Sequence, residues 1–218
     1  MIADRESTSA ARSLHWGAVA VLMAACVALS VVTFNNPRLA PLANLSPLYA
    51  FGLLLVAYPP KRRFGVATAI GLLLTTRLLA DLGIAIKERD WSDGFYSMQW
   101  IQYLSLTVLA SFGVWLRGRM TERHVFEVAG KSFLAAVAFF IVSNLAVWLV
   151  PGNESWPGYA TTWSGLRDCF AMALPFFRST LIACVAVTLV LMSGPVLDLL
   201  CRRDESDSPV SRPLTTVS

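Results

Sequence analysis

The chain has 218 residues, of which 56% are hydrophobic and 15% are charged, and its formal net charge is +4. A water-soluble globular domain does not carry so little polar surface, and the basic residues form no stripe interleaved with aromatic residues, which argues against nucleic-acid binding. The composition therefore predicts a protein embedded in a lipid bilayer.

Six apolar stretches follow one another along the sequence, and most of them are close to the roughly 20 residues that an α-helix needs to cross a bilayer. The sequence predicts an all-α membrane protein with six transmembrane helices within residues 15–200. A cytoplasmic segment, residues 1–14, precedes them, and a disordered cytoplasmic tail, residues 201–218, follows. The stretches are Trp16–Phe34, Pro47–Tyr58, Phe64–Leu82, Met98–Leu116, Ser132–Val150 and Met172–Leu191.

The basic residues alternate between the gaps and set the orientation. Twelve of the 18 Lys and Arg residues lie in the N-terminal segment, the second gap, the fourth gap and the tail. The other gaps hold only Arg38, Lys87, Arg89 and Arg167. Loops on the cytoplasmic side carry the excess of Lys and Arg, so both termini are expected in the cytoplasm.

The first stretch carries small residues at four-residue spacing, namely Ala20, Ala24 and Ala28. Such a stripe lets another helix approach closely. Two interpretations are open: packing inside the bundle, or docking of another subunit.

The second stretch is short. Ser46-Pro47 is typical of a helix start, and Pro59-Pro60 ends the helix. Twelve residues reach only about 18 Å, less than the ~30 Å of hydrocarbon. Residues 35–46 are therefore expected to dip below the outer surface or to cover a cavity, which predicts a pocket open to the exterior.

Ionisable and amide side chains at similar depth point to the same pocket. Arg77 and Asp81 are four residues apart on one helix face and can pair. Residue counting places Asn144 and Arg178 in the same outer layer. Either these groups are a structural ion pair and a snorkelling arginine, or they form the polar floor of a ligand pocket.

Catalytic and metal-binding motifs are not recognisable. The four cysteines lack CxxC spacing, so neither a disulfide nor a zinc site is expected. The sequence shows no P-loop, HExxH or GxSxG motif, and no catalytic residues are predicted.

Several strings carry a resemblance to a known family: Asn44-Leu45-Ser46-Pro47, Leu78-Leu79-Ala80-Asp81, residues 139–148 (FFIVSNLAVW) and residues 173–177 (ALPFF). With the short second helix and the alanine stripe, the chain resembles the BtuM-type S-components of the energy-coupling-factor vitamin transporters over about residues 15–195. The resemblance implies cobalamin uptake across the bacterial cytoplasmic membrane. Cobalamin is then the transported ligand rather than a cofactor.

The resemblance also implies roles for particular residues. The stripe would dock a coupling subunit, unless the protein acts alone. Some members of the family place a cysteine thiolate on cobalt; the matching position here is Ala80, which has no sulfur, so no metal ligand is expected.

A cobalamin pocket would draw on residues from several helices. Apolar walls are expected from Tyr49, Tyr96, Tyr103, Trp163 and Phe177, hydrogen bonds from Asn44, Ser46 and Asn144, and contacts near Arg77, Ala80 and Asp81, with Arg178 or Arg167 meeting the phosphate. Two alternatives stay open: an S-component for another vitamin, and a membrane enzyme or sensor that binds a lipid or quinone.

Overall fold

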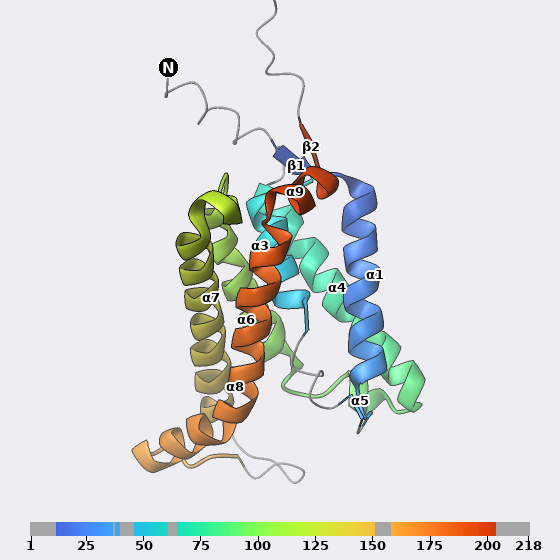
Figure 1. The fold of residues 1–218 in the computed structure, drawn as a ribbon. Coiled ribbons are helices and arrows are strands. Elements are labelled where there is room, and N and C mark those ends of the chain that lie inside the picture. Colours follow the sequence, from blue (N-terminus) through green and yellow to red (C-terminus); the bar gives the residue numbers. More distant parts are fainter. Residues whose placement is uncertain (1–11, 37, 40–45, 61–64, 151–157, 204–218) are drawn as a thin grey trace, which may run out of the picture.

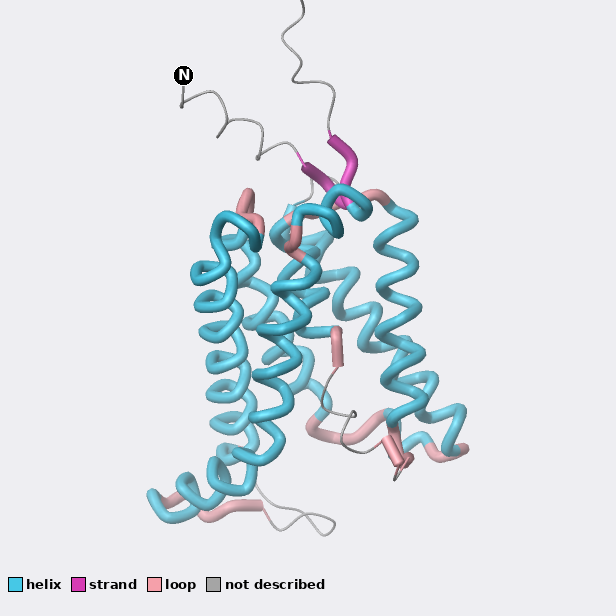
Figure 2. Tube along the Cα trace, viewed as in Figure 1, coloured by secondary structure: helices cyan, strands magenta, loops and turns pink. Residues whose placement is uncertain are grey.

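The computed structural model describes residues 12–36, 38–39, 46–60, 65–150 and 158–203. Helices make up nearly all of this path, and two short strands lie at one end of the molecule (Figure 2). The elements, in chain order, are β1 (Arg12–Leu14), α1 (Trp16–Thr33), α3 (Leu48–Ala57), α4 (Gly65–Glu88), α5 (Trp91–Gly94), α6 (Gln99–Ser111), the 3-10 helix η3 (Phe112–Leu116), α7 (Thr121–Leu149), α8 (Trp163–Leu191), α9 (Gly194–Leu200) and β2 (Cys201–Arg203).

Four helices, α1, α4, α7 and α8, are long and apolar enough to cross a membrane. The helix α3 is apolar but shorter. The fourth predicted stretch is divided between α6 and η3. The prediction of a helical membrane protein is therefore confirmed in its coarse form, with four helices of spanning length in the described part of the chain.

The observed helix ends agree with the predicted apolar stretches where the helix stops at a polar residue. They differ where the helix continues through polar residues. The bounds of α1 and α3 fall within a residue of the prediction. By contrast, α4 extends to Glu88, α7 begins at Thr121 and α8 begins at Trp163, each well outside its apolar stretch. Hydropathy marks the part of a helix that lies in lipid, whereas helix propensity lets polar turns continue it.

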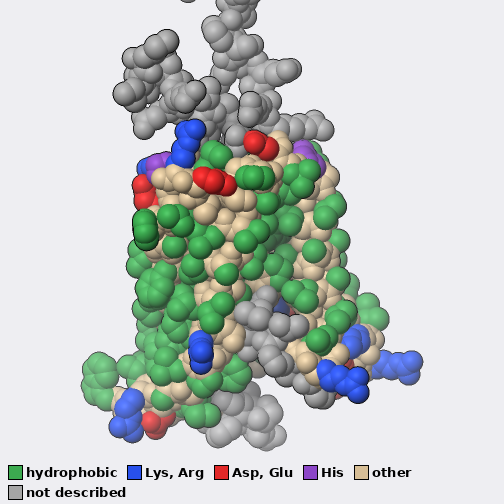
Figure 3. Space-filling view, viewed as in Figure 1, with side chains coloured by type: hydrophobic (Ala, Val, Ile, Leu, Met, Phe, Trp, Pro, Cys, Tyr) green, Lys and Arg blue, Asp and Glu red, His purple; other side chains and the backbone are tan. Residues whose placement is uncertain are grey.

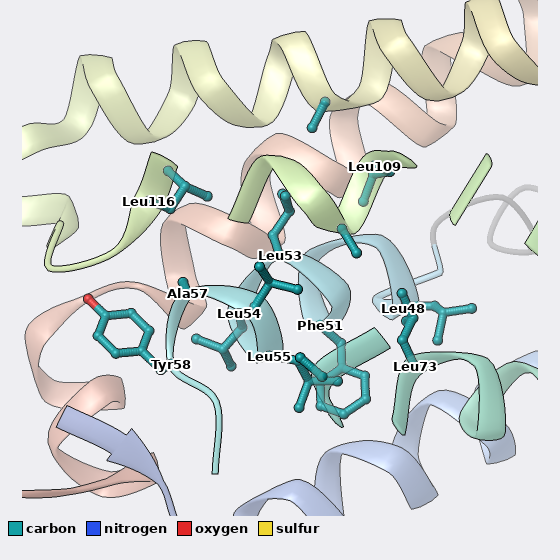
Figure 4. Packing of buried hydrophobic residues seen from close by; sticks show 14 of the residues in the cluster. Leu48, Phe51, Leu53, Leu54, Leu55, Ala57, Tyr58, Leu73, Leu109 and Leu116 are labelled. Carbon is teal, nitrogen blue, oxygen red and sulfur yellow. The ribbon is translucent and has the colours of Figure 1, made fainter. Parts of the chain in front are cut away.

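The centre of the bundle is α3. Apart from Tyr49, every residue of this helix is buried. Its side chains pack against Leu73 of α4, Leu109 of α6 and Leu116 of η3 (Figure 4). A helix that is hydrophobic on all sides is stable only when other elements surround it, so the other helices form a wall around α3.

One end of the bundle gathers both ends of the described chain. Strands β1 and β2 pair in antiparallel fashion, with Leu14 opposite Cys201 (Figure 1). The amide of Leu14 donates to the carbonyl of Tyr58 at 3.2 Å, and the hydroxyl of Tyr58 donates to the carbonyl of Arg119 at 2.9 Å. We call this the ribbon end; it includes residues 12–14 and 201–203, which the sequence analysis assigned to the terminal segments.

The surface divides into bands. Most charged side chains lie at the two ends of the bundle, and hydrophobic side chains cover most of the surface between them (Figure 3). Ala20, Ala24 and Ala28 are all exposed on α1, which packs mainly on α4. The alanine stripe therefore faces outward, and the interpretation that it packs inside the bundle does not hold within the described residues.

Candidate functional site

Four polar side chains meet between α4 and α6, and we call them the outer ionic cluster: Arg77, Asp81, Gln99 and Tyr103. The Arg77 Nη2 and Asp81 Oδ1 atoms are 2.6 Å apart, which confirms the predicted pair. The Tyr103 hydroxyl donates to Asp81 Oδ2 at 2.9 Å, and the Gln99 amide donates to the same oxygen. Asp81 thus accepts two hydrogen bonds at Oδ2 and forms an ion pair with Arg77 at Oδ1, while its own side chain is only 1% exposed.

Local sequence places these groups on facing sides of two helices. Arg77 and Asp81 are four residues apart on α4, and Gln99 and Tyr103 are four residues apart on α6, so each pair lies on one helical face. The short helix α5, which lies between α4 and α6 in the sequence, packs closely against α4 because Gly94 has no side chain. A Cβ atom at Gly94 would collide with the Asp81 carbonyl oxygen.

The short helix α5 is itself held by its capping residue. Asp90 accepts a hydrogen bond from the Ser92 amide at 2.8 Å and another from the Ser92 hydroxyl at the same distance. These hydrogen bonds lower the pKa of Asp90, so its capping carboxylate stays ionised at neutral pH.

The cluster lies in the half of the bundle away from the ribbon end. Counting from Gly65, Arg77 is about 18 Å and Asp81 about 24 Å along α4, at about 1.5 Å per residue. Isolated charges at such depth in a membrane are costly, so pairing and hydrogen bonding are expected. One donor stays unused: Arg77 Nε is buried and has no hydrogen-bond partner among the described residues.

Two tyrosines predicted for the site lie near this cluster. Tyr49 and Tyr96 are both within electrostatic interaction distance of Arg77. Tyr49 also places its ring edge-on to Phe139, with ring centroids 5.1 Å apart. Tyr96 is 42% exposed in the connection before α6. The structure therefore brings Tyr49, Arg77, Asp81, Tyr96 and Tyr103 into one neighbourhood.

Ala80 lies beside the cluster but inside the bundle. It is 2% exposed and continues the buried stripe of Leu73 and Thr76 on α4. Ser46 serves the backbone: its Oγ accepts from the Leu48 amide at 3.3 Å, just before α3. The predicted hydrogen-bonding residue Asn44 lies outside the described residues.

The predicted residues on α7 and α8 lie apart from the cluster. The Asn144 amide donates to the Phe140 carbonyl of its own helix at 2.7 Å. Phe177 stacks on Phe140 with ring centroids 4.4 Å apart. Arg178 is exposed, about 160° around α8 from the buried Thr180. The polar layer that residue counting assigned to three helices is supplied, in the described part, by α4 and α6.

Trp163 lines a different feature, which we call the α7–α8 pocket. It is a cavity of about 290 Å³ lined by Ile141, Leu145, Trp163, Leu166, Arg167 and Phe170. Trp163 itself is 86% exposed and is the first residue of α8. The sequence interpretation took this part of the chain for a loop, whereas residues from Trp163 onward are helical.

Gln99 is the cluster residue that sequence reasoning missed. It lies at the start of an apolar stretch and four residues before Tyr103. A buried amide at this spacing from a tyrosine was the available signal, since buried polar side chains need partners.

Comparison with known proteins places this chain in a protein family. No curated protein matches this chain, and no solved structure does. The sequence pattern of one family matches residues 12–202, nearly all of the described chain. The chain belongs to that family, the family of unknown function DUF6580.

Proposed function

We propose that this protein binds a solute from the outside of the bacterial cytoplasmic membrane and delivers it inward, and that the solute is cobalamin. The observation that carries the proposal is the outer ionic cluster. Its arginine keeps a buried, unused donor at Nε, next to a central helix too short to cross the bilayer. A buried donor without a partner is uncommon in folded proteins, which supports a ligand with acceptor groups at the partly exposed Arg77 guanidinium.

The proposed topology has six membrane crossings with both termini in the cytoplasm. Four apolar helices of spanning length support it. We assign the two remaining crossings to α6 with η3, and to the part of the chain that contains the short helix α3, which covers only part of the bilayer by itself. The basic residues Arg117 and Arg119 lie at the ribbon end, next to Tyr58. Because cytoplasmic loops carry the excess of positive charge, the ribbon end is the cytoplasmic end in this proposal.

Cobalamin suits the neighbourhood of the cluster in chemical terms. Its amide arms and phosphate offer acceptors to Arg77 and hydrogen-bond partners to Gln99 and Tyr103. Its flat ring needs apolar and aromatic walls, which Tyr49 and Tyr96 offer near Arg77. Ala80 supplies no sulfur, so the proposal includes binding and transport but no thiolate chemistry at cobalt.

The exposed alanine stripe on α1 supports a partner in the membrane. Ala20, Ala24 and Ala28 form a smooth outward surface, which suits close approach of another helix. In this proposal the partner is a coupling subunit of the energy-coupling-factor type.

The proposal is tested by ligand retention. Purified protein is incubated with excess cobalamin, passed through size-exclusion chromatography and examined for corrin absorption in the protein peak. We expect near-stoichiometric retention for the unaltered chain and at least a tenfold loss of affinity for Arg77→Gln, since hydrogen bonds to a charged partner contribute about 1.5–3 kcal/mol.

The matched control is Arg89→Gln, which removes an exposed arginine that follows α4 in the same half of the bundle and should retain cobalamin. A colourless protein peak after incubation would reject cobalamin as the ligand. Retention of riboflavin or thiamine in a parallel incubation would then favour an S-component for another vitamin.

A further inference from the structure

The α7–α8 pocket lies outside the outer ionic cluster, and the proposed function does not use it. Five of its six lining residues are apolar, and the sixth is Arg167. Its volume of about 290 Å³ is at the lower end of the range for small-molecule sites. An open apolar groove beside one cation has the composition of a site for a hydrocarbon chain with a negatively charged head.

The pocket depends on a bend in α8. Pro175 lies inside this helix, and the turns before it lean to one side of the bundle (Figure 1). Proline removes a backbone donor and clashes with the preceding turn, so it bends the helix. We call the turns from Trp163 to Met172 the α8 arm.

Contacts with α7 hold the α8 arm in place. Phe170 packs edge-on against Phe140 with ring centroids 5.3 Å apart, and the Cys169 thiol lies 3.5 Å from the Asn144 carbonyl oxygen. Much of the arm is nevertheless exposed, since Trp163 is 86% exposed and Met172 is 66% exposed. In the same view, hydrophobic and charged side chains lie next to each other on this arm (Figure 3).

This mixture is typical of a segment at the membrane–water interface. Tryptophan is enriched at that level, and an amphipathic helix there buries its apolar side among lipid chains. The arm lies at the end of the bundle opposite the ribbon end, where α8 begins (Figure 1).

Among the described residues, Arg167 is the one charged side chain that lines the pocket, and its contact with a carboxylate is an exposed one. Arg167 contacts only its neighbour Asp168, at 3.3 Å, and the two side chains are 79% and 57% exposed. Exposed pairs of this kind contribute little. Arg178, one turn beyond Pro175, is also exposed and makes no hydrogen bond or ion pair with any described residue. An arginine facing lipid is costly unless it reaches a phosphate at the interface.

We propose that the α7–α8 pocket binds one acyl chain of an anionic phospholipid, with the lipid phosphate held near Arg167. The apolar walls from Ile141, Leu145 and Phe170 bury the chain, and Trp163 covers it at the interface. Charge complementarity selects an anionic over a zwitterionic head group.

The test uses lipids whose chains carry bromine, which quenches tryptophan fluorescence on contact. Full-length protein is reconstituted in phosphatidylcholine vesicles with increasing fractions of brominated phosphatidylglycerol or brominated phosphatidylcholine. The difference between the unaltered chain and Trp163→Phe isolates the signal of Trp163. We expect half-maximal quenching at about a fivefold lower fraction of phosphatidylglycerol, the effect of one basic side chain near anionic lipid.

Two pairs of variants distinguish the effect of the Arg167 charge on lipid binding from the effect of the space inside the pocket. Arg167→Gln should remove the preference, whereas Arg89→Gln, an exposed arginine outside the pocket, should keep it. Leu145→Phe should fill the cavity and reduce quenching by both lipids, whereas Leu149→Phe, one turn further along α7 and 62% exposed, should not.

Three results would overturn the proposal. Equal quenching by both lipids would show that the pocket does not prefer an anionic head group. Undiminished preference in Leu145→Phe would place the lipid outside the pocket. Disulfide-linked dimers of Trp163→Cys in native membranes would assign this surface to a second copy of the chain.

Discussion

Asp81 is held by more polar contacts than any other side chain of the outer ionic cluster. It forms an ion pair with Arg77 and accepts hydrogen bonds from Gln99 and Tyr103 while almost fully buried. In an environment of low dielectric constant, such a carboxylate and its arginine stabilise each other, and neither is tolerated well alone.

Removal of one partner should therefore be worse than removal of both. We expect Asp81→Leu to destabilise the protein by about 3–5 kcal/mol because it leaves Arg77 charged and unpaired. The double variant Arg77→Met with Asp81→Leu should recover a large part of that loss. The apparent melting temperature in detergent, measured for both variants, checks this order.

The exposed pair of Arg167 and Asp168 serves as the control. Its charged atoms are 3.3 Å apart, and Asp168→Leu should change stability by at most about 1 kcal/mol. If the double variant at the cluster melts below the single variant, the two side chains are not stabilised mainly by each other.

At this scale the sequence predicted partners along a helix better than partners between helices. The pair Arg77–Asp81 followed from four-residue spacing alone and is confirmed. Residue counting also predicted one depth for Asn144 and Arg178, but counting does not give the direction of a side chain around its helix, which depends on the neighbours that pack there. Gln99 was missed although it lies four residues before Tyr103, because the burial that makes this amide need a partner depends on packing between α4 and α6.

At the scale of elements, η3 packs directly against the backbone of α3. Gly113 of η3 faces the carbonyl of Leu53, so a Cβ atom at residue 113 would collide with that oxygen and lie 2.8 Å from the Cβ of Val56. Neither the backbone nor a Cβ can move aside without a shift of the whole helix.

We therefore expect Gly113→Ala to destabilise the bundle by about 1–3 kcal/mol, the usual cost of overpacking a core. Gly71→Ala is the matched control, because a Cβ at Gly71 meets nothing within 4 Å and alanine favours the helix α4. Thermal unfolding of the two variants should shift in opposite directions. An unchanged melting temperature for Gly113→Ala would mean that η3 is not held against α3 as described.

The bounds of a helix could be predicted from the sequence only where hydropathy changes at the end of the helix. The bounds of α1 and α3 were predictable because apolar residues end where prolines or polar residues begin. The first turns of α7 and the α8 arm were not predicted as helix, since they lie outside the apolar stretches. The 3-10 geometry of η3 was not predictable either, because its apolar residues read as a continuation of α6.

At the scale of the whole molecule, hydrogen bonds between distant segments define two ends. At the ribbon end, the Thr121 amide donates to the Met192 carbonyl at 3.0 Å, and the His15 amide donates to the Leu200 carbonyl at the same distance. At the other end, Lys87 Nζ donates to the Phe34 carbonyl at 2.6 Å and joins α4 to α1. The charge pattern predicted that the termini share a side, whereas the ribbon itself was not predictable from three-residue strands.

The number of membrane crossings can be decided with two cysteines placed at opposite ends of the bundle. Arg89→Cys follows α4, and Leu199→Cys lies in α9 at the ribbon end; both positions are exposed, and Cys26, Cys169 and Cys184 are buried. The experiment uses a Cys201→Ser background. If the chain crosses the membrane six times, three crossings separate residue 89 from residue 199, so the two residues lie on opposite sides. An impermeant maleimide should then label residue 89 in intact cells and residue 199 only after permeabilisation. If only the four long helices cross, two crossings separate the sites, and both would be labelled from the same side.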